Sequence, residues 1–370
     1  INFNSNDQLA KFIFGIKASY YDGIPSVNRL FERIRTKTGK LSVSADSLFQ
    51  MRKVFSSLSV RKEESDIVCK FIDNLLEYRK YDKLQGTFLS GFLTHLGNDK
   101  RVRSSYLMTG TRTGRLSSSG PNMQNIPKDL RKVFIPKEGY IYLEADLSQI
   151  ELRIASIIAN EENMMNAYKN GEDLHKLTAS KVSGKPLDQI TSEDRKKAKA
   201  VNFGFLYGMA ASSFKGYAEM EYDVFFTDQE ATQARNAYFL GYPGLTNWHR
   251  DVEHKVLTDG TIVSPFGRIY IFSKKRIAMD PEGGSGVVRQ AINYPVQGSA
   301  ADLCLYIMGQ LFDWKNKNGI DFNLVGTVHD SILFEVKRGL EVDLQNKIKN
   351  ICETISQKFN WITVPIVMDT

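Results

Sequence analysis

The 370 residues of this chain are 42% hydrophobic, 25% charged and 11% aromatic, which indicates a globular protein of several subdomains and excludes a disordered or collagen-like chain. Lysine and arginine outnumber aspartate and glutamate by 49 to 42, and the net charge of +7 favours polyanionic partners only weakly. The three cysteines form no CxxC pair, and no apolar run approaches the roughly 20 residues of a membrane span, so we expect reduced thiols in a soluble protein.

Helices are predicted for most of the first hundred residues. Ser5 and Gln8 form a potential capping box ahead of a short amphipathic helix. Apolar residues keep helical spacing over residues 63–85, and this helix is expected to end at Gly86. Between these helices the segment RIRTKTGK is a compact basic turn, and a solvated charge run is its simpler explanation when it is taken alone.

Two strand-forming segments each carry an aspartate at one end. The run YIYLEA precedes a helical pattern, so Asp146 lies where a strand gives way to a helix. The segments 322–328 and 332–336 indicate a hairpin with Asp330 at its turn. Either aspartate alone is explained as a cap or turn residue, but two carboxylates on rigid strand ends suit two-metal phosphoryl or nucleotidyl transfer.

Between the two aspartates, the run RKKAKAVNFGFLYG places basic and then aromatic residues four positions apart. These residues are Arg195, Lys199, Phe203 and Tyr207. A Thr-Ser pair before the run can cap a helix, on which the four side chains would form one line about 18 Å long. Such a line suits a nucleotide, with phosphates at the cations and the base at the aromatic rings. Without the flanking carboxylates, a solvated basic end joined to a buried aromatic end explains the pattern equally well.

Five segments, in this order, resemble the motifs of the DNA polymerase I family, also called family A. They are TGRLSSSGPNMQNIP, DLSQIELR, RKKAKAVNFGFLYG, RQAINYPVQGSAAD and VHDS. The resemblance covers the chain from about Ser105 to Val367, and the preceding part more loosely. It implies an α+β, right-hand polymerase fold with an antiparallel palm sheet, helical fingers and a helical thumb. The implied parts are a thumb at 1–104, a palm at 105–153 and 286–370, and fingers at 154–285.

The resemblance also implies a DNA-directed DNA polymerase that acts in replication or repair with two Mg²⁺ ions, which Mn²⁺ can replace. Asp146 and Asp330 would hold the metals together with the backbone carbonyl of Leu147, and Arg195 and Lys199 would complete the catalytic set. The residues implied to bind the dNTP are His175, Arg195, Lys199, Phe203, Tyr207, Glu151, Gln149 and Ile150.

Within that set, Glu151 matches a steric gate that is linked to Tyr207 and excludes a ribose 2′-hydroxyl. Phe203 matches the position that discriminates against dideoxynucleotides. The residues implied to contact DNA are Arg115, Asn122, Gln124, Asn125, Arg289, Asn293, Gln297 and His329, with Arg35, Lys37 and Lys40 of the basic turn.

The chain departs from the family pattern at two positions. Motif C commonly has Glu after its His-Asp pair, whereas this chain has Ser331. Motif A commonly has Tyr after its Asp, whereas this chain has Leu147. The missing Glu removes an auxiliary charge and is expected to alter metal affinity or preference. The change at Leu147 is expected to matter less, because the ligand there is backbone.

Two alternative functions stay open. One is a single-subunit RNA polymerase, against which Glu151 and the TGRLSS motif argue. The other is an inactive nucleic-acid-binding subunit, against which the retained aspartates and cations argue. We expect a monomer that binds primer-template DNA and dNTPs in a bacterial or phage-infected cytoplasm or in an organelle, and that is not secreted. Exonuclease, helicase or processivity partners are expected to lie outside this chain.

Overall fold

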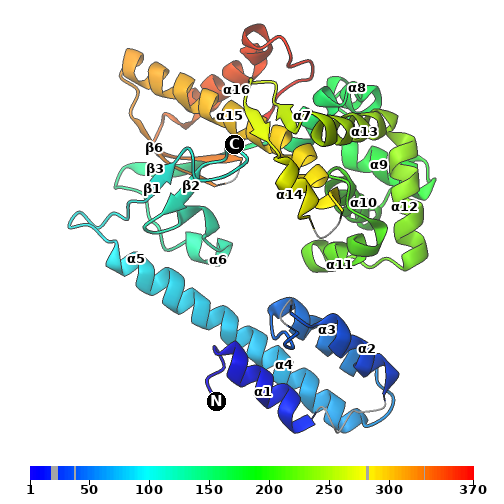
Figure 1. Ribbon diagram of the computed structural model, residues 1–370. Coiled ribbons are helices and arrows are strands. Elements are labelled where there is room, and N and C mark those ends of the chain that lie inside the picture. The colour runs from blue at the N-terminus through cyan, green and yellow to red at the C-terminus, as the bar shows by residue number, and fades with distance from the viewer. Residues whose placement is uncertain (18–23, 37–38, 281–282, 329) are drawn as a thin grey trace. The chain divides into compact units, whose positions relative to one another are not determined.

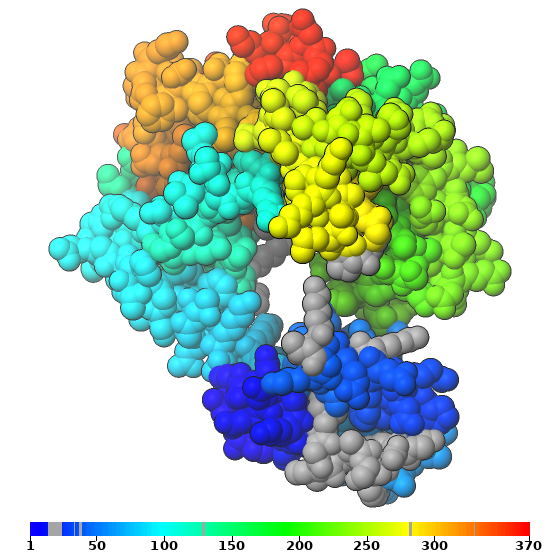
Figure 2. Space-filling model, in the orientation of Figure 1, coloured from blue at the N-terminus to red at the C-terminus, as the bar shows by residue number. Residues whose placement is uncertain are grey.

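The computed structural model describes residues 1–17, 24–36, 39–280, 283–328 and 330–370. It divides into two compact units, Ile1–Arg103 and Ser104–Thr370, each with its own hydrophobic core (Figure 1). Figure 2 shows the molecular surface in the same colours, which run from blue at the N-terminus to red at the C-terminus. In the described part of the chain, no helix is both long enough and apolar enough to cross a membrane.

The N-terminal unit is helical. Its elements are α1 (Asn6–Lys17), α2 (Pro25–Arg33), α3 (Ala45–Ser56), α4 (Lys62–Lys83), the π-helix η2 (Leu84–Ser90) and α5 (Gly91–Thr94). Leu9, Leu48 and Ile72 are among the apolar residues that the helices bury in a common core. At the start of α1 the Ser5 hydroxyl accepts a hydrogen bond from Gln8 N, but the Gln8 side chain accepts from Asn2 N, so half of the predicted capping box forms.

The helix predicted for residues 63–85 does not end at Gly86. Helical structure continues without a break through η2 and α5 to Thr94. A glycine inside a helix costs only roughly 1 kcal/mol relative to alanine. Beyond it, Phe88 and Phe92 are buried one turn apart, with ring centroids separated by 6.1 Å. Burial of these two rings outweighs the weak stop signal of the glycine.

The C-terminal unit is built on an antiparallel sheet with the strand order β6-β7-β3-β8. Its strands are β3 (Tyr140–Leu147), β6 (Phe322–Val328), β7 (Ser331–Lys337) and β8 (Met368–Asp369). The predicted hairpin is confirmed, with β6 and β7 paired from Phe322 opposite Val336 to Val328 opposite Ser331. Two smaller antiparallel pairs join β1 (Ser105–Leu107) to β2 (Ser117–Ser119) and β4 (Thr261–Val263) to β5 (Ile269–Ile271).

Helices fill the long interval between β3 and β6 and follow β7. They are α7 (Ile150–Ile158), α8 (Glu162–Lys169), α9 (Leu174–Ser183), α10 (Ser192–Phe205), α11 (Ala211–Tyr222), α12 (Asp228–Gly241), α13 (Pro243–Thr258), α14 (Lys274–Ala278), α15 (Ser285–Asn318) and α16 (Glu341–Lys358). Short helical turns are η3 (Met123–Asn125), α6 (Lys128–Arg131) and η4 (Leu187–Gln189). In Figure 1, α9 to α13 gather in a green cluster, whereas α15 packs on the sheet against β6 and β7. The expected α+β class with an antiparallel sheet is confirmed.

Candidate active site

Two aspartates lie together at neighbouring strand ends. Asp146 is in β3, and its Cα lies opposite that of Ser331, the first residue of β7. Asp330 comes directly before Ser331, and its carbonyl accepts a hydrogen bond from Leu147 N at 3.1 Å. Burial raises the pKa of the Cys304 thiol on α15 to about 12, and the charges of Asp330 and Asp146 contribute to that rise. The backbone pairing therefore places both aspartates at the same end of the β3–β7 pair.

This pair suits a hard divalent cation. Mg²⁺ takes oxygen ligands, keeps several waters and needs only one or two protein carboxylates when substrate phosphates are present. Among the residues that the structure describes, no group of three or more His, Cys, Asp or Glu side chains is arranged to hold a metal. Asp146 and Asp330 would therefore need further oxygen ligands from backbone, water or substrate. Leu147, the predicted backbone ligand, follows Asp146 in the same ladder.

Arg115 links the strand ends to α7. Its Nη2 donates to Glu151 Oε1 at 2.6 Å and to Asp330 Oδ1 at 3.3 Å. The hydroxyl of Tyr207 donates to the other carboxylate oxygen of Glu151. Burial raises the pKa of Glu151, and the charge of Arg115 and the hydrogen bond from Tyr207 oppose this rise. Burial and the Glu151 charge raise the pKa of Tyr207 far above its ordinary value, so its hydroxyl stays a donor.

The loop that carries Arg115 is held by α15 and β5. The Tyr270 hydroxyl donates to the carbonyl of Thr113 at 2.9 Å, and Arg115 N donates to Thr113 Oγ1 at 3.4 Å. Gly298 makes room for this contact, because a Cβ there would collide with the Tyr270 hydroxyl and lie 2.5 Å from the Thr113 carbonyl. Arg115 is thus oriented by packing between elements that lie far apart in the sequence.

The helix predicted from the RKKAKAVNFGFLYG run forms as α10. Its N-terminus has a complete capping box, in which Thr191 Oγ1 accepts from Asp194 N and the Asp194 carboxylate accepts from Thr191 N. Arg195 Nε donates to Asp173 Oδ2 at 2.7 Å, and Lys199 is exposed one turn later. The prediction that all four side chains lie along one helix is wrong for Tyr207, because α10 ends at Phe205 and Tyr207 lies in the turn that follows. That turn directs Tyr207 to Glu151.

His175 is buried beside the same helix. Its Nδ1 accepts a hydrogen bond from the Asn202 amide at 2.9 Å, which leaves the ring proton on Nε2. The Thr178 hydroxyl lies 3.0 Å from Asn202 Oδ1 and 2.8 Å from the Tyr242 hydroxyl, so the amide is itself fixed. Burial lowers the pKa of His175 to about 4, and the charge of Arg195 adds to the effect. The imidazole is therefore neutral near pH 7 and has a defined tautomer.

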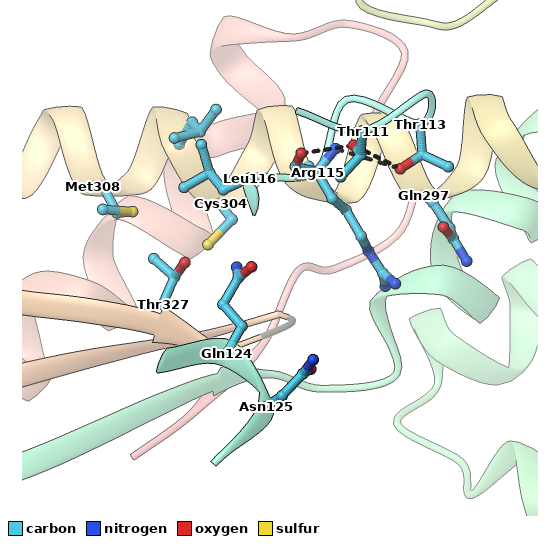
Figure 3. Close-up of a pocket in the computed structure, with 12 residues that line it drawn as sticks. Thr111, Thr113, Arg115, Leu116, Gln124, Asn125, Gln297, Cys304, Met308 and Thr327 are labelled. Atoms are coloured by element: carbon cyan, nitrogen blue, oxygen red, sulfur yellow. Dashed lines mark hydrogen bonds between the residues drawn. The ribbon is translucent and has the colours of Figure 1, made fainter. Parts of the chain in front are cut away.

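A cavity of about 300 Å³ adjoins Arg115 (Figure 3). Four predicted DNA-contact residues line it together with small and apolar residues. The lining is Thr111, Thr113, Arg115, Leu116, Gln124, Asn125, Gln297, Ala301, Cys304, Leu305, Met308 and Thr327. Asn122 lies just outside this lining, and its Oδ1 accepts from Gln124 N as the cap of η3. Arg289 and Asn293 occupy earlier turns of α15 than Gln297 and are not in the lining.

Gln149, Ile150 and Phe203 were also predicted to bind the dNTP, and they differ in burial and in their partners. Gln149 caps α7 in the left-handed conformation, with its Oε1 accepting from the Tyr168 hydroxyl at 3.2 Å, and Ile150 is a buried core residue. Phe203 packs with its ring centroid 6.0 Å from that of His175. The predictions for His329 and Lys37 lie outside the described residues.

The basic turn belongs to the N-terminal unit. There the Arg35 guanidinium donates to the carbonyl of Gly39 at 2.8 Å, and Lys40 lies 3.2 Å from Asp7. Both members of the Lys40 pair are well exposed, so this pair adds little stability. Among the described residues of this turn, the Arg35 and Lys40 side chains are exposed.

Glu144 was missed by the sequence reasoning. Its Oε1 accepts a hydrogen bond from the Ser331 hydroxyl at 2.9 Å, and Arg131 Nη1 donates to the same oxygen at 3.2 Å. The available signal was the alternation of the strand, because residues two apart share a face and Asp146 lies two positions later. The contact with Ser331 itself depends on the register between β3 and β7.

Comparison with known proteins gives a consistent set of similarities. The model of the family described as DNA polymerase family A matches residues 1–370. The chain is 32% identical over 384 residues to a thermostable DNA polymerase I of Thermus thermophilus, which covers 100% of this chain and 41% of that protein. It is 36% identical over 280 residues to DNA polymerase I of Aquifex aeolicus, covering 75% of this chain and 46% of the relative.

A solved structure is similar over the whole chain. It is the POL domain of Pol1 from M. smegmatis in complex with a DNA primer-template and dNTP. The TM-score is 0.79 at 28% sequence identity, and the match covers 100% of this chain and 60% of the other. The chain therefore spans less than half the length of the two curated relatives and about three fifths of the structural neighbour.

Proposed function

The chain belongs to DNA polymerase family A, as its motifs predicted, and from that premise we propose that it catalyses template-directed DNA synthesis. It adds a deoxynucleotide to the 3′-hydroxyl of a primer and releases pyrophosphate. The observation that carries the proposal is the pair of strand-end carboxylates, Asp146 and Asp330, with Arg115 joining Asp330 to Glu151. The proposal concerns the reaction of this domain, and any other activity of the longer relatives lies beyond it.

Family A polymerases use divalent metal ions, and we assign Asp146 and Asp330 as the ligands of two Mg²⁺ ions, with the Leu147 carbonyl beside them. Mn²⁺ would substitute because it accepts the same oxygen ligands. When bound, such ions would supply Lewis-acid activation of the attacking hydroxyl and charge stabilisation at the leaving oxygen. The protein's own contribution is rigidity, because Asp146 lies in β3 and Asp330 lies directly before β7, where its carbonyl accepts a hydrogen bond from Leu147 N.

The triphosphate is assigned to the cations of α10 and to His175. Arg195 and Lys199 pair with phosphate oxygens, and the Nε2–H of neutral His175 donates to another. The primer oxygen forms a bond to the α-phosphorus, and the bond from that phosphorus to the bridging oxygen breaks. The 3′-hydroxyl proton passes to solvent, and Lys199 donates a proton to the departing pyrophosphate.

The choice of sugar is assigned to Glu151. Its carboxylate is enclosed by Arg115 and Tyr207, so a ribose 2′-hydroxyl would have to displace a buried, hydrogen-bonded group. This arrangement favours a DNA polymerase over a single-subunit RNA polymerase. Phe203 lacks a hydroxyl that could replace the missing 3′-hydroxyl of a dideoxynucleotide, which supports its role in discrimination.

Contacts to the DNA duplex are assigned to polar residues that line the cavity beside Arg115 and to residues of α15. Gln124, Asn125 and Gln297 present amide groups there, and amides and Arg115 suit the acceptors that all base pairs share in the minor groove. Arg289, Asn293 and the basic turn at residues 33–40 remain proposed contacts to template and phosphates. Residues 1–104 are proposed as the thumb, 105–153 with 286–370 as the palm, and 154–285 as the fingers.

Primer extension tests the proposal. The wild type, Asp146→Asn and Asp313→Asn would be compared on a labelled primer-template with each dNTP and Mg²⁺. Asp313 is an exposed aspartate on α15 and serves as the matched control. We expect extension by the wild type and Asp313→Asn and its loss in Asp146→Asn. Equal signals from all three would mean a contaminating enzyme and would leave the inactive-subunit alternative, whereas preferred use of GTP over dGTP would favour the RNA polymerase alternative.

A further inference from the structure

Ser331 occupies the position at which motif C commonly has an acid, and its hydroxyl donates a hydrogen bond to Glu144 on the neighbouring strand β3. Ser331 is 4% exposed, and its Oγ lies 2.9 Å from Glu144 Oε1 and 3.0 Å from the carbonyl of Val328. Both partners are acceptors, so the single hydroxyl proton serves one of them at a time. The charge-assisted bond to the carboxylate is the stronger choice. Ser331 therefore holds Glu144 at the start of β7.

Glu144 shares a strand face with Asp146. The side chains of a strand alternate, and Glu144 and Asp146 are exposed whereas Ala145 and Leu147 are buried. Residues two apart in a strand are about 7 Å apart at Cα. Asp146 lies opposite Ser331, and Asp330 directly precedes Ser331. One end of the β3–β7 pair therefore carries Glu144, Asp146 and Asp330.

Arg131 restrains this third carboxylate. Its Nη1 lies 3.2 Å and 3.4 Å from the two oxygens of Glu144. The side chains of both partners remain partly exposed, at 38% and 47%, so solvent and added ions still reach them. Arg131 therefore orients Glu144 and opposes its negative charge without sealing it from the site.

We propose that Glu144 is an auxiliary acid beside the metal site, does not itself ligate the cation, and supplies the negative charge that Ser331 lacks. It is a positioning residue: its charge strengthens cation binding at Asp146 and Asp330, and the Ser331 hydroxyl sets its distance from them. In this chain the auxiliary acid is therefore Glu144 on β3, instead of a residue at the start of β7. This inference rests on the proposed two-metal reaction, and it concerns how strongly this chain binds the cation.

Binding of Mn²⁺ alone tests the proposal without turnover. Free Mn²⁺ would be measured by electron paramagnetic resonance during titration of the protein, without DNA or nucleotide. Glu144→Gln is expected to raise the Kd about three- to tenfold, because it removes one negative charge from the strand face that also carries Asp146. Glu138→Gln removes an exposed carboxylate just before the other end of β3 and should leave the Kd unchanged. Equal Kd values for these two variants would overturn the proposal.

Two further variants separate charge from structural damage. Arg131→Gln keeps Glu144 and removes the opposing charge, so it should lower the Kd, whereas damage to the strand end would raise it. The double variant Glu144→Gln with Ser331→Glu returns the acid to β7 and should restore the affinity of the wild type. Thermal unfolding of each protein would show that the fold is kept. Failure of the relocated acid to restore affinity in a folded protein would contradict the account.

The same titration separates this inference from the proposed function. Asp146→Asn should abolish the Mn²⁺ binding that Glu144→Gln only weakens. If Asp146→Asn has no effect, there is no metal site at the strand ends and both proposals fail. If Asp146→Asn removes binding and Glu144→Gln does not change it, the metal site stands and the role of Glu144 is wrong.

Discussion

The strand ends and the α9–α10 region hold their functional groups in different ways. Asp146 and Asp330 are fixed by the backbone hydrogen bonds of paired strands. His175 and Arg195 are instead held by single side-chain partners, Asn202 and Asp173. A backbone ladder tolerates changes in neighbouring side chains, whereas a side-chain network fails when one member is lost. The proposed metal site should therefore be robust in position, and the proposed nucleotide site should be sensitive to single substitutions.

The largest expected effect in the helical region follows loss of the Lys199 charge. Lys199→Ala removes the cation that we propose stabilises the leaving phosphate, and one such group is worth about 10²–10³-fold in rate. Single-turnover incorporation should show this loss in kcat/KM for the dNTP. Lys196→Ala is the matched control, because Lys196 is on the same helix and donates instead to the carbonyl of Asp223. Equal kinetics for the two variants would remove Lys199 from the mechanism.

Acid should destabilise the helical region through its buried histidines. Burial lowers the pKa of both His175 and His249 to about 4. The unfolded chain binds protons first as the pH falls below about 6.5, so stability is complete above that pH and is lost down to about pH 4, by roughly 3 kcal/mol per histidine. Urea unfolding of the wild type and His249→Gln at pH 7, 5.5 and 4 measures the difference. Parallel pH profiles for the two proteins would refute the assignment for His249.

Loss of the Glu151 carboxylate should weaken discrimination against ribonucleotides. Glu151→Ala is expected to lower the ratio of dGTP to GTP incorporation by about 10–100-fold, because a buried group no longer blocks the 2′-hydroxyl. The ratio of the two kcat/KM values is the measurement. Glu162→Ala removes an exposed carboxylate from the first turn of α8 and should keep the ratio. An unchanged ratio in Glu151→Ala would place sugar selection elsewhere.

The smallest of these effects is expected at Phe203. Phe203→Tyr adds one hydroxyl and should raise dideoxynucleotide incorporation about tenfold, which corresponds to one hydrogen bond of ordinary strength. A chain-termination assay with mixed dNTP and ddNTP measures the selectivity. Phe225→Tyr, at a well-exposed ring, is the control. The same selectivity in both variants would contradict the proposed role of Phe203 in dideoxynucleotide discrimination.

Local sequence patterns predicted the elements that local chemistry determines. The β6–β7 hairpin, the capped start of α10 and the place of Asp146 between strand and helix follow from alternation, capping residues and turn residues. The other predicted site residues came from the resemblance to family A, and their roles remain proposals. Helical continuation past Gly86 depends on burial of Phe88 and Phe92, which a glycine stop signal does not report.

Contacts between segments that are far apart in the chain could not be predicted from the sequence. Arg115 reaches Asp330 across 215 positions, and Ser331 reaches Glu144 across 187. The first contact depends on the packing of the Arg115 loop against α15 and β5, and the second depends on the register between β3 and β7, so neither follows from a local pattern. The departure of Tyr207 from the α10 line has the same origin, because its partner Glu151 lies on another helix.

Single-turnover insertion opposite a defined template base tests the central claim most directly. The wild type and Asp330→Asn would be mixed with a primer-template and one dNTP in Mg²⁺, and the template base would be varied. The account predicts that the inserted nucleotide follows the template base and that Asp330→Asn lowers the rate by at least about 10³-fold, with the fold unchanged. Insertion that ignores the template, or that survives in a folded Asp330→Asn protein, would contradict it.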